Sequence, residues 1–227
     1  MEQKIKSEGH CIYCSDKYSK RGMSRHIETH LKQLAKEAKS GKQKTVPAFH
    51  VRVEAWEYFL QLLVNGEKPL DDLDSFLRQI WLECCGHMSS IMDKNRLEYG
   101  MGILTKKLFK KGDTLKHIYD WGSTTECTIK VISEHRIPME ESIRLLSRNE
   151  PLAIPCDSCG KNPAVEMCTV HGWDEDFRFC GRCGNKHRKK CSDAADYSMM
   201  DFFNSPRTGV CAYEGGQIDL KRDVLQG

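Results

Sequence analysis

Cysteine and histidine residues occur in this chain at spacings that suit metal binding. The densest run lies between Cys156 and Cys191 and contains four pairs of donors. Three pairs are separated by two residues and the last by three: Cys156/Cys159, Cys168/His171, Cys180/Cys183 and His187/Cys191. Two such pairs can close one tetrahedral zinc site, so the block predicts two sites. Its polar, glycine-rich sequence buries little apolar surface, and the metal would supply folding free energy.

The spacing of these pairs leaves three arrangements open. In the interleaved one, the first and third pairs form one site and the second and fourth form the other, which resembles the cross-brace of MYND and RING-like modules. Sequential pairing and a single zinc ribbon from the first and third pairs fit the spacing as well. We expect the interleaved arrangement. Because all donors are Cys or His and no position is left for water, these sites would be structural rather than catalytic.

A third donor set lies near the N-terminus, where Cys11, Cys14, His26 and His30 follow the spacing C-x2-C-x11-H-x3-H. Histidines one helical turn apart share a helix face and can bind one ion together with two cysteines of a tight turn. The segment resembles the Cys2His2 zinc finger, although the usual central spacing is one residue longer. Its helix is expected to continue as far as Ala38.

The N-terminal segment also carries most of the basic charge. The first 45 residues contain eleven Lys and Arg against five Asp and Glu, whereas the formal net charge of the whole chain is only +3. Of the base-reading positions that the resemblance implies, only Arg25 suits a bidentate contact to guanine. One finger covers about three base pairs, which is too few for specificity on its own. We expect Lys20, Arg21 and Arg25 to contact nucleic acid.

The stretch from Val46 to Ser147 has the apolar content of a folded core. VPAFHVRVEAWEYFLQLLV predicts either two strands or a buried helix. Apolar residues at spacings of three and four predict an amphipathic helix over 70–81. Further strands are expected over 97–104 and 128–132, and the segment MEESIRLLSRN is expected to be a short helix. The fold class predicted from these elements is α+β.

Two segments of this stretch, LDDLDSFLRQIWLECCGHMSSI and LKHIYDWGSTTECTIKV, resemble the plasmid open-reading-frame-three-like family named after an Ri plasmid of Agrobacterium. Trp81, His87 and Met88 match the first motif and Tyr119 to Gly122 the second, while Ser123 to Thr125 replace its acidic and aromatic end. The resemblance implies an α+β domain with a mostly antiparallel sheet and no established activity.

Three parts are therefore predicted along the chain. Residues 1–45 form the finger and basic arm, residues 46–150 the α+β domain, and residues 151–227 a cysteine-rich zinc-binding domain and tail. The sequence has no membrane-spanning apolar run. Twelve cysteines behind a start without a signal-peptide pattern predict a reducing, cytoplasmic environment.

Enzyme motifs are not recognised in the sequence: it contains no phosphate loop, dinucleotide-binding glycine pattern, zinc-protease motif or nucleophile elbow. Cys84, Cys85 and His87 are compatible with a reactive thiol or a metal site, but we interpret the cysteines as core residues. Asp120 is interpreted as a turn residue. Cys211 is set aside because the four pairs are complete without it.

These patterns predict a non-enzymatic zinc-binding interaction protein with three Zn²⁺ ions per chain, which contacts nucleic acid through its finger. One alternative is a protein-protein adaptor whose zinc modules bind protein partners. A second alternative is an enzyme with an unrecognised site in the core domain. No membrane partner is expected.

Overall fold

The computed structural model describes residues 5–171, 177–191, 198–211, 213–223 and 225. They form two compact units. Ser7–Arg78 and His87–Glu150 make up the first, called the sheet unit, and Gln79–Gly86 with the described residues from Pro151 onward make up most of the second, called the tail unit. Among the described residues, no helix has the length and apolar character needed to cross a membrane.

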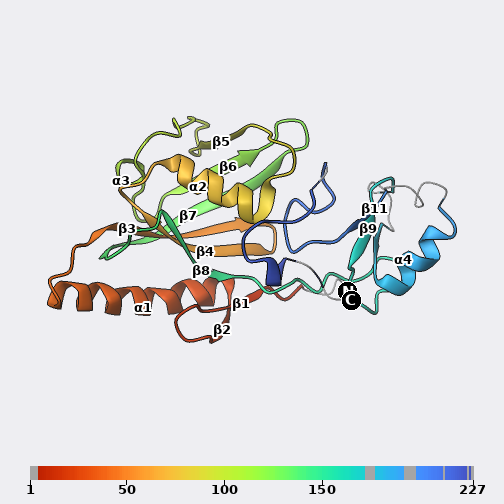
Figure 1. Ribbon diagram of the computed structural model, residues 1–227, viewed down its shortest axis with the longest axis horizontal. Helices are drawn as coiled ribbons and strands as arrows, with labels where there is room; N and C mark the ends of the chain where they lie inside the picture. The colour runs from red at the N-terminus through yellow and green to blue at the C-terminus, as the bar shows by residue number, and fades with distance from the viewer. Residues whose placement is uncertain (1–4, 172–176, 192–197, 212, 224, 226–227) are drawn as a thin grey trace. The chain divides into compact units, whose positions relative to one another are not determined.

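A six-stranded sheet forms the frame of the sheet unit (Figure 1). Its strands, in spatial order, are β5 (Ser89–Met92), β6 (Thr114–Tyr119), β7 (Thr125–Ile137), β3 (Val46–Ala55), β4 (Tyr58–Asn65) and β8 (Ile143–Arg148). Every neighbouring pair is antiparallel. The prediction of an α+β fold with a mostly antiparallel sheet is confirmed, and VPAFHVRVEAWEYFLQLLV forms the β3–β4 hairpin.

The long helix α1 (Lys20–Ser40) lies along one face of this sheet (Figure 1). Its apolar residues at spacings of three and four are buried, among them Met23, Ile27 and Leu31. They share one hydrophobic cluster with Phe59 and Leu63 of β4. The predicted continuation of the helix to Ala38 is confirmed, and its length is set by this packing, since isolated helices are marginal in water.

The short hairpin of β1 (Glu8–His10) and β2 (Lys17–Ser19) is a separate two-stranded sheet that lies next to β8. The amide of Ile12 donates to the carbonyl of Leu146 at 3.0 Å, and Gly9 forms an isolated bridge with Asn149. The N-terminal finger and the sheet therefore share both a hydrogen-bonded edge and a core, so this segment does not stand apart from residues 46–150.

Helix α2 (Leu70–Leu77) covers the opposite face and continues as the π-helical turn η1 (Arg78–Leu82). Its Asp74 carboxylate lies 2.6 Å from Nε2 of the buried His117 on β6. His117 lies opposite Cys127 of β7 in the strand register, so both side chains point to the face that α2 covers. Side chains alternate between the two faces of the sheet, and Arg52 of β3 therefore points to the other face, where it bonds Ser24 of α1. The sheet unit is thus a three-layer α/sheet/α arrangement.

Two predicted elements are wrong. The segment MEESIRLLSRN contains strand β8 instead of a helix, because the edge of β4 satisfies its backbone groups. No strand spans 97–104; that segment, which contains Gly100 and Gly102, forms turns and isolated bridges before the short helix α3 (Thr105–Leu108). Glycines weaken a strand because they lose more backbone entropy and offer no side chain to pack.

The tail unit contains a small antiparallel sheet in the order β10 (Arg178–Phe179), β9 (Glu166–Cys168) and β11 (Met199–Asp201). Helix α4 (Gly181–Arg188) follows β10 directly, and a 3-10 turn, η3 (Leu220–Arg222), lies near the C-terminus. The residues after β11 pack against Gln79–Gly86, where the hydroxyl of Ser205 donates to the carbonyl of Trp81 at 2.7 Å.

Candidate metal centres

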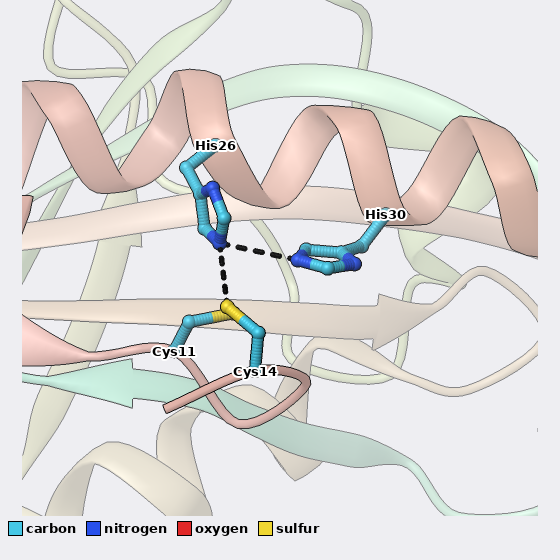
Figure 2. Close-up of side chains that lie close together, drawn as sticks. All are labelled: Cys11, Cys14, His26 and His30. Atoms are coloured by element: carbon cyan, nitrogen blue, oxygen red, sulfur yellow. Dashed lines mark hydrogen bonds between the residues drawn. The ribbon is translucent and has the colours of Figure 1, made fainter. Parts of the chain in front are cut away.

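The N-terminal donor set comes together between the β1–β2 turn and α1. Figure 2 shows the rings of His26 and His30 pointing from the helix toward the turn that carries Cys11 and Cys14. The Sγ of Cys14 and Nε2 of His30 each lie 3.1 Å from Nε2 of His26, and the ligand atoms of all four residues lie within 4.8 Å of one another. Donors around a tetrahedral zinc ion are separated by about 3.3–3.8 Å, so this set is compatible with zinc.

The surroundings of this set also suit a metal ion. The amide of Tyr13 donates to the Sγ of Cys11 at 3.4 Å. Tyr18 stacks on the ring of His26 with centroids 4.4 Å apart. Burial lowers the pKa of His26, and the adjacent His30 lowers it further, so its ring is neutral and able to bind a cation.

The first donor set of the tail unit consists of Cys156, Cys159, Cys180 and Cys183, whose sulfur atoms lie within 4.8 Å of one another. Cys156 and Cys159 lie on a tight turn in which the amide of Gly160 donates to the carbonyl of Cys156 at 2.8 Å. The other two thiols flank the start of α4. Four thiols at this distance form a closed set of soft donors that suits zinc.

The turn of this set is prepared for ionised thiols. Backbone amides of Lys161 and Asn162 lower the pKa of Cys159 to about 6, which favours the thiolate form that binds metal. The next residue after Cys156, Asp157, holds strand β10 in place: its Oδ1 accepts from Nη2 of Arg178 at 2.8 Å. This charge-assisted, bidentate contact fixes the turn relative to the strand that leads into α4.

The second donor set of the tail unit consists of Cys168, His171, His187 and Cys191. Nδ1 of His171 lies 3.2 Å from the Sγ of Cys168 and 3.9 Å from that of Cys191. Burial is the largest influence on Cys168 and opposes its ionisation, but hydrogen bonds from His171, His187 and the backbone together outweigh burial and lower the pKa of Cys168 to about 6. Among the described residues, the buried Nε2 of His187 has no hydrogen-bonding partner, which a metal ion would supply.

Helix α4 contributes one donor to each of these sets, Cys183 to the first and His187 to the second. The four-residue spacing turns the two side chains toward neighbouring sites on one helix. Gly184 between them has no room for a side chain, because a Cβ there would lie 1.7 Å from Oε1 of Glu166. That carboxylate bonds Arg188, which fixes α4 against β9.

The structure thus brings the tail ligands together in the interleaved arrangement. Sequential pairing would group other residues, and a single zinc ribbon would leave the second and fourth pairs without a site, so neither arrangement matches these donor groups. Each set is made only of Cys and His, so four protein donors would complete a tetrahedral coordination.

The residues predicted to contact nucleic acid lie at the start of α1 but differ in their surroundings. Lys20 is engaged within the sheet unit: its Nζ donates to the carbonyl of Trp56 at 3.1 Å and lies 3.3 Å from the carboxylate of Glu57. Arg21 and Arg25 are exposed on the helix.

The surroundings of Cys84, Cys85, His87 and Asp120, the residues considered for an enzyme site, differ from one another. The interpretation of Cys84 and Cys85 as core residues is wrong, since Cys85 is exposed and Cys84 half-buried. Asp120 is a turn residue with φ 63°, and its Oδ1 accepts a hydrogen bond from the amide of Gly122 at 2.9 Å. Its other oxygen lies 3.5 Å from Nε2 of His87.

Comparisons with known proteins add little to this description. No protein-family model matches the chain, and no curated protein matches it significantly. Among solved structures, it is similar to the crystal structure of MM3350, a protein of unknown function from Methanosarcina mazei Go1, at 12% identity and a TM-score of 0.36. The match covers 51% of this chain and 75% of that one, and at this level it carries no argument. The resemblance to the Ri-plasmid family stays a prediction.

Proposed function

We propose that this chain is a cytoplasmic, non-enzymatic interaction protein, stabilised by zinc, that binds the phosphate backbone of nucleic acid through the exposed face of α1. The observation that supports this most directly is a stripe of exposed basic side chains along the helix. Five residues form this stripe, here called the basic stripe: Arg21, Arg25, Lys32, Lys36 and Lys39.

The stripe follows from helical geometry. At about 100° per residue its five positions fall within an arc of about 60°, and they extend over about 27 Å of the helix axis. The buried apolar positions and the two zinc-ligand histidines lie on other faces, each centred roughly 130° from the stripe. One helix therefore packs on the sheet, holds the metal donors and presents positive charge to solvent on three separate faces.

Helix α1 has two acidic side chains, and only that of Glu28 reaches a member of this stripe. Glu28 faces the sheet, where it bonds Ser133, and its other oxygen lies 3.5 Å from Nζ of Lys32. Glu37 accepts a hydrogen bond from Gln33, which is outside the stripe. The stripe thus keeps a net positive charge that matches a row of phosphates spaced about 3.4 Å apart along one strand.

The contact is expected to be insensitive to base sequence. A helix that presents a lengthwise row of Lys and Arg positions itself on phosphates, and base readout needs side chains in a groove. Arg25 is the member that best suits an added contact to guanine. Lys20, which is held by Glu57, is assigned to fixing the start of α1 and not to binding. Closed Cys and His donor sets support a non-enzymatic role, since catalytic zinc keeps an open position.

The test is the salt dependence of binding of the full chain to a labelled 20-nucleotide single strand and to the corresponding duplex, measured by fluorescence anisotropy. Five phosphate contacts give a slope of log affinity against log salt of about −4.5 on duplex DNA, a loss of roughly 500-fold between 50 and 200 mM salt. A variant with the five stripe residues changed to Gln should lose the binding and the slope together.

A matched control removes five exposed basic residues elsewhere in the sheet unit. These are Lys94, Arg96, Lys107, Lys110 and Lys111, each changed to Gln. Equal loss of affinity in both variants would mean that overall charge matters and not the stripe. Absence of binding by the unchanged protein at 50 mM salt would exclude the proposal and leave the protein-protein adaptor as the next candidate.

A further inference from the structure

Three further thiols gather in the tail unit, outside the donor sets described above. Cys84 and Cys85 follow η1, and Cys211 comes from the segment after β11, more than a hundred residues later in the chain. The Sγ of Cys85 lies 3.4 Å from that of Cys211 and 3.8 Å from that of Cys84. All three sulfur atoms lie within 4.8 Å of one another, the same closeness as in the predicted zinc sites.

The approach of Cys211 is built into the fold of the tail. Ser205 of the Asn204-Ser205-Pro206-Arg207 turn bonds the carbonyl of Trp81, and the amide of Gln217 donates to the carbonyl of Gln79 at 2.6 Å. These two contacts fasten the chain on either side of Cys211 to the segment that carries the other thiols. Cys211 itself adopts φ 56°, a left-handed conformation that a non-glycine residue seldom takes without compensating contacts.

A buried cation lies beside the three thiols. Arg207 is fully buried, and its Nη2 donates to the Sγ of Cys84 at 3.5 Å. Three soft thiolate donors at one point select a thiophilic ion such as Zn²⁺ over Mg²⁺ or Ca²⁺.

We propose that Cys84, Cys85 and Cys211 form a fourth metal site, which binds Zn²⁺ and fastens the segment after β11 to the end of η1. Three thiolates leave one position of a tetrahedral site for a fourth ligand. The metal joins parts of the chain that are far apart in sequence, so its binding free energy contributes directly to the stability of this packing.

A disulfide between Cys85 and Cys211 is the competing use of these thiols. Their sulfur atoms are 3.4 Å apart, well beyond the bonded distance of about 2.05 Å. A disulfide would also leave Cys84 and its Arg207 contact unexplained, whereas a metal ion uses all three sulfurs. Alkylation can distinguish the two, because a chelator releases metal-bound thiols and a reductant releases a disulfide.

The experiment uses the full chain, purified with zinc in a reducing buffer and freed of excess zinc. Native mass spectrometry is expected to find four zinc ions per chain, against three in Cys211→Ala. The control Cys127→Ala, which removes a buried cysteine outside every donor group, should keep four. Three zinc ions in both the unchanged protein and Cys211→Ala would overturn the proposal.

Thiol mapping of the unchanged protein gives a readout that does not depend on how the variant folds. Although Cys85 and Cys211 are exposed, iodoacetamide should modify them only after a chelator has removed zinc. Modification without chelator would show that they are free thiols, and release by a phosphine reductant but not by chelator would show a disulfide. Either of these two results would overturn the proposal.

Discussion

Shortening Leu31 to alanine tests whether the finger helix is part of the core of the sheet. Leu31 is 0% exposed and packs in the cluster that also contains Ala48, Phe59 and Leu63. Removing a fully buried leucine side chain costs about 2–5 kcal/mol, through lost burial and the cavity left behind. That is a large part of the roughly 5–15 kcal/mol that stabilises a typical domain.

The assay is hydrogen exchange of the sheet read by mass spectrometry. If α1 and the sheet unfold together, the amides of β3 and β7 should exchange roughly 30 to 5,000 times faster in Leu31→Ala, the factor that corresponds to about 2–5 kcal/mol. The matched control is Leu97→Ala, since Leu97 is 61% exposed in the same unit. It should change stability by less than about 0.5 kcal/mol.

One result would refute the shared core. If exchange in Leu31→Ala rises only within residues 20–40 while β3 and β7 keep their protection, the finger is an independent module that merely rests on the sheet. Zinc content measured on the same sample separates this from damage to the site, because the neighbouring His30 is a predicted ligand.

Two further predictions concern the contacts that hold the finger to the sheet. The pKa of Glu28 is held well below its usual value by His50, whose Nδ1 lies 4.0 Å from Oε2 of Glu28, and by Ser133. The ionised Glu28 therefore stabilises the folded protein above about pH 4.3, and this stabilisation is lost as the pH falls below that value. Denaturant unfolding at pH 7 and pH 4 should therefore show a smaller acid loss in Glu28→Gln than in the unchanged protein; an equal loss would refute this. A Cβ on Gly9 would lie 2.2 Å from the backbone carbonyl of Arg148, so Gly9→Ala should lower the free energy of unfolding by about 1–3 kcal/mol. Gly100→Ala, where a Cβ meets nothing within 4 Å, should be close to neutral in the same melts, and equal effects would remove the steric reasoning.

Much of the local structure could be predicted from the sequence. The helix spacing of apolar residues predicted α1 and α2, and donor spacing predicted the groups of the finger and the tail. These signals are local, because a helix repeats within a few residues and a donor pair lies on one turn. The prediction of a mostly antiparallel sheet came from the resemblance to a known family. Periodicity alone could not decide whether the segment that forms the β3–β4 hairpin would be two strands or a buried helix.

What the sequence alone could not determine depends on contacts between distant residues. Strand β8 looks helical by itself and becomes a strand because the edge of β4 pairs with it. The choice among the possible pairings of the tail donors required α4 to place Cys183 and His187 at neighbouring sites.

The division between sequence and tertiary structure is clearest at the two ends of the chain. The sequence determined the composition of each donor set and the periodicity of the helix that carries the first one. Only the tertiary structure decided that this helix shares the core of the sheet, and that Cys211 comes within 3.4 Å of Cys85. The physical reason is that burial and ligand geometry depend on distance in space, which spacing along the chain determines only over a turn or two.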